Sequence, residues 1–347
     1  MRQYSKLIIP KFVWLFVLSF LAITVNIAAQ KPITVIFDTD MGNDVDDVLA
    51  LDMLYKYQDA NIINLAAIMN NKGNAYSIPF LHLMNQWYGY PYIPLGNVVN
   101  SPVKEGKKKY YVEYVYNLKS ADSNNIFSNF RSELKVTPAV ELYRKILATQ
   151  PDRSVVIISV GFSTNLSRLL ESQADTYSNL NGAELVSNKV KLLSIMGGDF
   201  REQRKPEFNI RLDIKSARHM LENWPGKIYI SPWELGASIK FPGETIATGL
   251  NYTNRINPLI KAYEYYLPMP YDREVWDLTS VLYAVEPSSK YFKISKSGKV
   301  TVDEKGNTFF QRDKKGERYV LSANSKQLQQ MKDRMEELVK QKPRKLK

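Results

Sequence analysis

The sequence has no cysteine and only two histidines among its 347 residues. Without cysteine, the chain cannot form disulfides, thiolate metal sites or a lipid anchor attached through a thiol. It also has no internal repeat and no long low-complexity segment. Hydrophobic residues make up 44% and charged residues 24%, which is typical of a globular protein. The fold must therefore be stabilised by its core alone, and the length allows one large α/β domain or two smaller ones.

The first 29 residues differ in composition from the rest. Residues 1–11 contain Arg2, Lys6 and Lys11 and no acid, residues 12–25 are apolar, and small residues follow up to Ala29. This order predicts a signal peptide cleaved after Ala29, and hence a periplasmic or secreted protein. An uncleaved membrane anchor is the alternative, although the apolar block is short for a full span.

The formal net charge is +12, with seven Lys or Arg and three Asp or Glu in residues 331–347. A basic tail can contact nucleic acid or anionic lipid. No basic patch interleaved with aromatic residues occurs elsewhere, and an export signal argues against nucleic acid. We therefore expect diffuse surface charge and no nucleic-acid partner.

Short apolar runs rich in β-branched residues predict buried parallel strands at 33–38, 63–69, 154–161, 190–198 and 227–231. Helical spacing between them, as in residues 48–58, predicts an α/β fold with an open, mostly parallel sheet and helices on both faces. Thr137 and Pro138 predict the N-cap and first residue of a helix ending near Thr149.

The core domain is expected at residues 30–292. Residues 100–130, rich in Tyr, Lys, Asn and Ser, predict a long loop or lid. From about residue 290, short alternating runs are split by SGK, KGN and KKG, and a charged helix is expected from about Ser325. Residues 293–347 are therefore predicted to be a β-hairpin and helix extension of the same domain.

Five aspartates follow the first predicted strand, namely Asp38, Asp40, Asp44, Asp46 and Asp47. The carboxyl ends of parallel strands are where open α/β sheets bind ligands. Crowded carboxylates repel one another unless a divalent cation lies among them, and oxygen ligands alone favour Ca²⁺ or Mg²⁺. A helix cap is the alternative for Asp46 or Asp47, but it accounts for one aspartate only.

Two enzyme classes use such a loop. In the haloacid-dehalogenase phosphatases, Asp38 would be the nucleophile, Asp40 the acid/base, and Mg²⁺ the partner of the phosphate. Gly42 and Asn43, however, stand where that family has a threonine. The other class uses the carboxylates to hold Ca²⁺ against the hydroxyls of a sugar.

Three later segments favour the second class: VGFSTNLSRLL (160–170), MGGDFREQRKPEFNIRLD (196–213) and REVWDLTSVLYAV (273–285). Together with the aspartate loop, in this order and spacing, they resemble the inosine-uridine-preferring nucleoside hydrolase family. The resemblance covers residues 33 to about 292. It implies a Ca²⁺-dependent hydrolase of the N-glycosidic bond of ribonucleosides or related ribosides.

The resemblance assigns the Ca²⁺ ligands to the carboxylates of Asp40, Asp47 and Asp277 and the backbone carbonyl of Thr164. It makes Asp40 the general base for a water molecule held by the ion. Asp46 would accept a hydrogen bond from a ribose hydroxyl. This loop is two residues longer than the family's shortest form, so Asp44 is an alternative to Asp46, and Asp38 is expected to orient the loop.

For the sugar, the resemblance implies that Asn74 touches the ribose and that Glu207 and Asn209 hold its 5′ and 3′ hydroxyls. A carboxylate and an amide suit the recognition of hydroxyls in a dry pocket. Asn74 could instead be a turn residue, and Glu207 or Asn209 could cap the next helix.

The sequence departs from the family at two positions. Trp276 replaces the histidine that acts as leaving-group acid, so it can stack on a base but not protonate it. Arg201 stands about where the family has a ribose-binding asparagine. Either sugar recognition is altered, for example toward an acidic or phosphorylated substrate, or the loop pairs differently. His82 and His219 lie in predicted helices and are interpreted as structural. A tyrosine of the long loop, Tyr111, Tyr114 or Tyr116, is either an alternative acid or stacking group, or part of a surface insertion.

These departures leave two alternatives beside the hydrolase. One is a ribose- or nucleoside-binding protein that has lost the chemistry, and the other is a hydrolase of a different glycoside. In each case the partner is a small nucleoside or riboside. Residues 293–347 could also pack on a neighbouring subunit of a homo-oligomer.

Overall fold

The computed structural model describes residues 31–103, 110–130, 133–250, 252 and 254–345. The chain divides into two units, Met1–Lys31 and Pro32–Lys347, and every element below belongs to the second. The predicted signal peptide lies outside the described residues. In the described part of the chain, no helix combines the length and apolarity that a membrane span requires.

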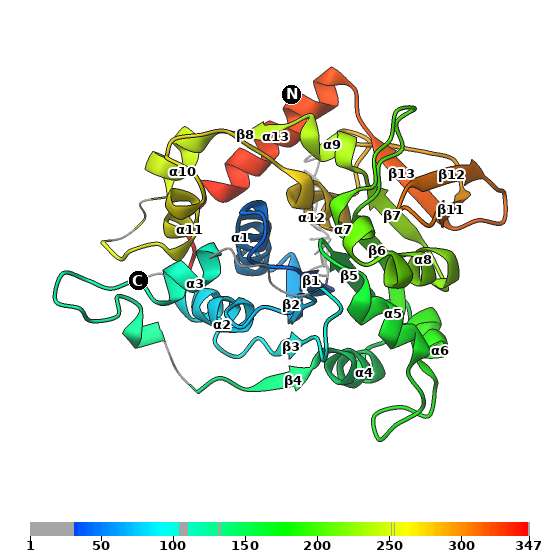
Figure 1. Cartoon of the computed structure of the whole chain (residues 1–347), viewed down its shortest axis with the longest axis horizontal. Coiled ribbons are helices and arrows are strands. Elements are labelled where there is room, and N and C mark those ends of the chain that lie inside the picture. Colours follow the sequence, from blue (N-terminus) through cyan, green and yellow to red (C-terminus); the bar gives the residue numbers. More distant parts are fainter. Residues whose placement is uncertain (1–30, 104–109, 131–132, 251, 253, 346–347) are drawn as a thin grey trace, which may run out of the picture. The chain divides into compact units, whose positions relative to one another are not determined.

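The described residues form a mostly parallel sheet of eleven strands, which confirms the predicted fold class (Figure 1). The strand order is β12-β11-β13-β7-β6-β5-β1-β2-β3-β4, with β10 paired to β13. The strands are β1 (Ile33–Thr39), β2 (Ile63–Asn70), β3 (Leu95–Asn97), β4 (Val136–Pro138), β5 (Val155–Ser159), β6 (Val190–Met196), β7 (Ile228–Ser231), β10 (Lys293–Ile294), β11 (Gly298–Val302), β12 (Thr308–Arg312) and β13 (Arg318–Ser322). Two short strands, β8 (Lys240–Phe241) and β9 (Arg273–Glu274), pair separately.

Helices alternate with the parallel strands along the chain, as the sequence pattern predicts. They are α1 (Asp46–Asp59), α2 (Ser77–Trp87), α3 (Tyr111–Tyr116), α4 (Ala139–Thr149), α5 (Thr164–Glu171), α6 (Gly182–Lys189), α7 (Phe208–Leu212), α8 (Ile214–Asn223), α9 (Trp233–Ala237), α10 (Gly243–Gly249), α11 (Pro258–Tyr266), α12 (Trp276–Val285) and α13 (Ser325–Val339). The segment predicted as a long loop carries α3 and one 3₁₀ turn, Ser128–Phe130.

The central strands are buried on both faces. Successive side chains of a strand point to opposite faces, and in β1 Val35 and Phe37 belong to one core cluster while Ile36 belongs to a second. The first cluster includes residues of α1, α2, α12 and α13, and the second includes residues of α4, α5 and α8. Helices therefore cover both faces, which explains why these strands read as continuous apolar runs.

The predicted start of α4 is wrong. Thr137 and Pro138 belong to β4, where Gly96 pairs with Thr137 in parallel register, and the helix begins at Ala139. Pro138 is the N-cap, with an extended ψ of 131°. A proline also biases the residue before it toward extended backbone, so Thr137 continues the strand.

The C-terminal segment forms a hairpin and a helix and continues the sheet. β13 pairs in parallel with β7, and β11 pairs antiparallel with β12. Asn324 and Gln327 form a capping box at the start of α13. Met331 and Met335 on this helix join the core cluster of α1, so residues 293–345 complete the same core.

Candidate active site

The aspartate loop leaves the end of β1, and its first aspartate faces the protein interior. Asp38 is fully buried and accepts hydrogen bonds from Asn71 (2.7 Å), Tyr143 (2.8 Å) and Asn165 (3.3 Å). Burial raises the pKa of Asp38 to about 7, against these three hydrogen bonds. Asp38 thus ties the ends of β1 and β2 to α4 and α5 beneath the loop.

The loop turns sharply at Gly42, whose φ is +121°. A side chain is strained at such an angle, and a Cβ there would lie 3.1 Å from Val112. The backbone N–H of Gly42 donates to the hydroxyl of the buried Tyr111 at 2.9 Å. This turn directs the next aspartates toward the start of α1.

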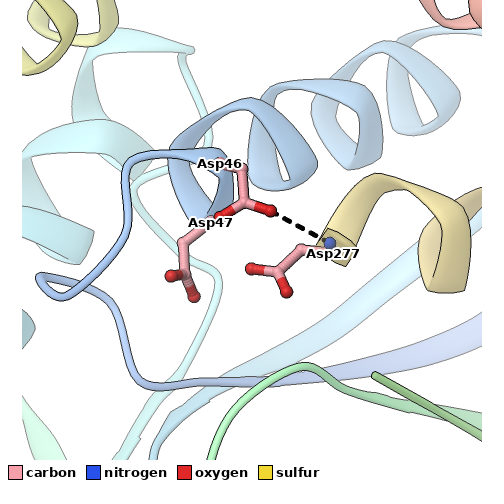
Figure 2. A group of neighbouring side chains, drawn as sticks. All are labelled: Asp46, Asp47 and Asp277. Carbon is pink, nitrogen blue, oxygen red and sulfur yellow. Dashed lines mark hydrogen bonds between the residues drawn. The ribbon is translucent and has the colours of Figure 1, made fainter. Parts of the chain in front are cut away.

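Three buried carboxylates meet where two helices begin (Figure 2). Asp46 and Asp47 open α1, and Asp277 lies in the first turn of α12. One carboxylate oxygen of each lies within 4.8 Å of the other two. The backbone N–H of Asp277 donates to Asp46 at 3.1 Å, which fixes the two helix starts against each other.

The surroundings of this cluster disfavour the simultaneous ionisation of its three carboxyl groups. Burial, followed by repulsion from neighbouring aspartates, raises the pKa of Asp46, Asp47 and Asp277 well above the usual range. The charge of Arg273 opposes this rise at Asp46 but is weaker than burial, and the Thr39 hydroxyl donates to Asp47. A divalent cation would offset this crowding, and a purely carboxylate donor set suits a hard ion. The residues present therefore fit a metal ion.

Asp40 lies beside this group of three but outside it. Its carboxylate accepts a hydrogen bond from the side chain of Asn43 at 2.6 Å, and Asn43 in turn accepts one from the ammonium of Lys72 at 2.5 Å. Burial raises the pKa of Asp40 to about 6, an effect that the charge of Lys72 opposes. Lys72 was not among the site residues predicted from the sequence.

The carboxylates line a cavity of about 980 Å³. Most of the site residues predicted from the sequence meet in its wall: Asp40, Asp44, Asp46, Asp47, Glu207, Asn209, Trp276 and Asp277. They come from the β1–α1 loop, the start of α1, the segment after β6 and the start of α12. Because β1 and β6 are separated only by β5 in the sheet, their carboxyl ends lie at one edge.

Glu207 and Asn209 open α7 on one side of this cavity. Glu207 is the N-cap, and it accepts from the backbone N–H groups of Asn209 (3.0 Å), Ile210 (3.2 Å) and Gly198 (3.3 Å). Burial raises its pKa to about 6. Asn209 donates to the Val160 carbonyl at 3.0 Å. Glu207 therefore caps the helix, as the alternative interpretation expected, and also faces the cavity.

Aromatic side chains form another part of the wall. The indole N–H of Trp276 donates to the Trp233 carbonyl at 3.1 Å, and the two rings lie 6.5 Å apart. Further aromatic residues of the wall are Tyr110, Tyr111, Phe208, Tyr265 and Tyr266. His82 and His219 lie on α2 and α8, as predicted, and neither lines the cavity.

An ion pair between Arg273 and Asp44 completes the wall. The guanidinium bonds both oxygens of Asp44, with Nε to Oδ1 at 2.9 Å. Its centre lies 5.0 Å from the ring of Trp276 and 5.2 Å from the ring of Tyr266. Sequence reasoning missed Arg273, although it stands three residues before Trp276, because no spacing rule pairs it with Asp44.

Three other predicted residues do not line the cavity. The Thr164 hydroxyl donates to Asp213 at 2.5 Å. The Asn74 side chain accepts from the backbone N–H groups of Tyr76 and Ser77, at 2.6 and 3.1 Å, at the start of α2. Arg201 pairs with Asp199 at 2.6 Å.

The three tyrosines of the long segment take different places. Tyr111 lines the cavity, and its hydroxyl contacts Gly42 and the sulfur of Met41. Tyr114 stacks on Tyr265 with ring centroids 4.4 Å apart, and Tyr116 packs near Tyr76. Only Tyr111 of these three therefore faces the site.

Comparison with solved structures shows the same fold in several proteins. An inosine-uridine preferring nucleoside hydrolase from Bacillus anthracis is 18% identical, with a TM-score of 0.65 over 88% of this chain and 99% of that one. A purine-preferring ribonucleoside hydrolase from Gardnerella vaginalis is 17% identical, with a TM-score of 0.61 over 88% and 99%. The type III effector XopQ, solved with adenosine diphosphate ribose, is 14% identical, with a TM-score of 0.61 over 90% and 94%.

No curated protein sequence matches the chain significantly. The family model for inosine-uridine preferring nucleoside hydrolases matches residues 35–338. This match extends past residue 292, where the sequence motifs end, into the C-terminal segment. The chain belongs to the inosine-uridine preferring nucleoside hydrolase family, a family of N-glycosyl hydrolases.

Proposed function

We propose that this protein hydrolyses the N-glycosidic bond of ribonucleosides or related ribosides in a Ca²⁺-dependent reaction. The observation that carries the proposal is the group of three buried carboxylates, Asp46, Asp47 and Asp277, in the wall of a cavity with aromatic sides. Carboxylates suit both a hard cation and the positive charge that develops on a ribose ring.

The proposed ligands of the ion are Asp40, Asp47, Asp277 and the carbonyl of Thr164. When bound, Ca²⁺ supplies positive charge that orients ribose hydroxyls and makes a water molecule more acidic. The resemblance to the family supports Asp40 and Thr164 in this set, and the geometry of the carboxylate group supports Asp47 and Asp277. Asp46 belongs to the same group, so it can contact either the ion or a sugar hydroxyl.

The side chains of the cavity have distinct proposed tasks. The oxygen of a water molecule attacks the anomeric carbon, and Asp40 accepts a proton from that water. Asp46 accepts a hydrogen bond from a ribose hydroxyl, while Glu207 and Asn209 hold the 5′ and 3′ hydroxyls. The C–N bond breaks with its electron pair leaving on the base, and the buried carboxylates stabilise the charge on the ring.

Trp276 takes a different task on the leaving-group side. Its ring offers a stacking surface for a planar base, held by Trp233 and Arg273. An indole does not protonate a leaving group, so the base leaves as an anion or takes its proton from solvent. Substrates with good leaving groups are therefore expected to react fastest.

We also propose that the protein acts in the periplasm or outside the cell, after cleavage behind Ala29. The N-terminal charge and hydropathy pattern supports this location. N-terminal sequencing of the protein purified from its natural host tests it: a mature chain beginning at Gln30 is expected, and a chain retaining residues 1–29 contradicts it.

Release of free ribose or ribose derivative from a substrate panel tests the function. The panel contains inosine, uridine and adenosine, 4-nitrophenyl riboside, a nucleoside 5′-monophosphate and ADP-ribose, the last because XopQ was solved with it. Asp40→Asn should lose at least ~10³-fold in kcat, since it removes the proton acceptor. Nucleoside binding without hydrolysis of any substrate would instead favour a binding protein.

A further inference from the structure

The C-terminal hairpin contacts the turn behind the active-site wall, and Thr308 forms hydrogen bonds with this turn. Thr308 opens β12 and is 1% exposed. Its hydroxyl accepts the backbone N–H of Asp199 and donates to the carbonyl of the same residue, both at 3.0 Å. This two-bond clamp fixes the peptide units on both sides of Asp199, 109 residues earlier in the chain.

The turn that Thr308 holds forms hydrogen bonds with two residues that line the cavity. Gly198, immediately before Asp199, has a φ of +78°. Its N–H donates to Glu207 at 3.3 Å, and its carbonyl accepts the N–H of Trp233 at 2.8 Å. Glu207 and Trp233 both line the cavity. The peptide between Gly198 and Asp199, whose N–H Thr308 holds, thus carries the carbonyl that binds Trp233, and the peptide before it carries the N–H that binds Glu207.

Asp199 also ties this turn to Arg201. Its carboxylate accepts from Nε and Nη2 of Arg201, at 2.9 and 2.6 Å, and from the backbone N–H of Lys205 at 3.0 Å. The guanidinium of Arg201 then lies 4.2 Å from the centre of the Trp233 ring. Arg201 thus packs on Trp233 and does not itself line the cavity.

The hairpin itself is anchored on the helix that follows Glu207 and α7. Arg218 of α8 donates to the carbonyl of Val302 at 2.8 Å and pairs with Glu304. β11 therefore packs on α8, and Figure 1 shows β11 and β12 next to this helix, in orange beside green. The clamp and the anchor together join the C-terminal segment to the segment 197–213.

We infer that Thr308 is a positioning residue for sugar recognition: through the turn at Gly198 and Asp199, it positions Glu207 for the ribose and Trp233 behind the ring of Trp276. The inference rests on the proposed function, because it concerns the sugar contacts of the same cavity. It assigns the C-terminal hairpin a part in substrate recognition.

The experiment compares Thr308→Val, which keeps the shape but removes both hydrogen bonds, with Thr308→Ser, which keeps the hydroxyl. Inosine, 5′-deoxyinosine and 3′-deoxyinosine are the ligands, in the full-length protein with Ca²⁺. Binding is followed by tryptophan fluorescence and turnover by ribose release. Glu207→Gln identifies the hydroxyl that Glu207 holds. In this variant, the deoxyinosine that lacks this hydroxyl should bind and react as well as inosine does.

Thr308→Val should lower the preference for that same hydroxyl about five- to tenfold, mainly through KM, while Thr308→Ser keeps it. Combined with Glu207→Gln, Thr308→Val should cause no further loss of preference, since both act on one contact. A variant that unfolds at lower temperature but keeps the wild-type preference would overturn the inference alone. Wild-type protein that neither binds nor hydrolyses any riboside of the full substrate panel would overturn the proposed function and the inference with it.

Discussion

Asp277 donates its backbone N–H to the carboxylate of Asp46 at 3.1 Å, across a sequence separation of 231 residues. This bond joins the first turns of α1 and α12 and leaves the carboxylate of Asp277 beside that of Asp47 (Figure 2). The metal site that we propose is therefore built by the packing of two helix starts, and its carboxylates come from segments 231 residues apart in the chain.

Replacing one of these carboxylates should weaken metal binding. Asp277→Asn removes a charge but keeps the backbone N–H that bonds Asp46, so the two helix starts stay joined. We expect Ca²⁺ affinity to fall on the order of 100-fold, about 2.7 kcal/mol, measured by calorimetry. Asp152→Asn is the control, because Asp152 is an exposed aspartate that pairs with Lys189. Equal affinity of Asp277→Asn and wild type would remove Asp277 from the site.

Trp276 should contribute to binding more than to the chemical step. Base stacking on an aromatic side chain contributes about 1–3 kcal/mol, so Trp276→Ala should raise KM for inosine roughly 10- to 100-fold. Trp276→Phe keeps part of the surface and should fall between alanine and wild type. A loss confined to kcat, with KM unchanged in both variants, would argue that Trp276 does not stack on the base.

The ion pair of Asp44 and Arg273 should show strong coupling. Arg273→Gln leaves Asp44 unpaired among other acids, so we expect it to lower the free energy of unfolding by about 1–3 kcal/mol. Adding Asp44→Asn should restore part of this loss, which urea unfolding of the two single variants and the double variant measures. If the change in the free energy of unfolding of the double variant equals the sum of the two single changes, Asp44 and Arg273 are not coupled.

The sequence predicted the parts of the site that are local and missed those that depend on packing. The apolar run 33–38 and the aspartates after it predict a strand, a loop and a helix because strand pattern and charge crowding are local properties. The pairing of Arg273 with Asp44 and the clamp of Thr308 on Asp199 join segments 229 and 109 residues apart. Side-chain direction within a loop is equally nonlocal, since Asp38 faces Tyr143 while Asp40, two residues later, faces the cavity.

A second part of the fold offers a pH test away from the cavity. The buried Arg144 bonds both oxygens of Asp175, at 2.6 and 3.1 Å, and this hydrogen bonding lowers the pKa of Asp175 to about 2. A carboxyl with a lower pKa in the folded state stabilises the protein above its unfolded pKa, and this stability is lost as the pH falls through about 4 to 2.

Asp175→Asn should therefore lower the free energy of unfolding near pH 7 by about 1 kcal/mol, a figure reduced for the partial exposure of the carboxylate. The difference from wild type should shrink as the pH falls from 5 toward 3, in urea unfolding at each pH. Asp152→Asn, in an exposed pair with Lys189, is the matched control. A difference that stays constant with pH would contradict the ionic origin.

Metal removal tests the central claim most directly. Ribose release from inosine is measured with purified protein after treatment with EGTA, and again as Ca²⁺ is added back. The account predicts loss of hydrolysis on chelation and its recovery with Ca²⁺, but no recovery in Asp277→Asn at the Ca²⁺ concentration that restores the wild type. Hydrolysis that continues at the full rate after complete removal of divalent ions would contradict it.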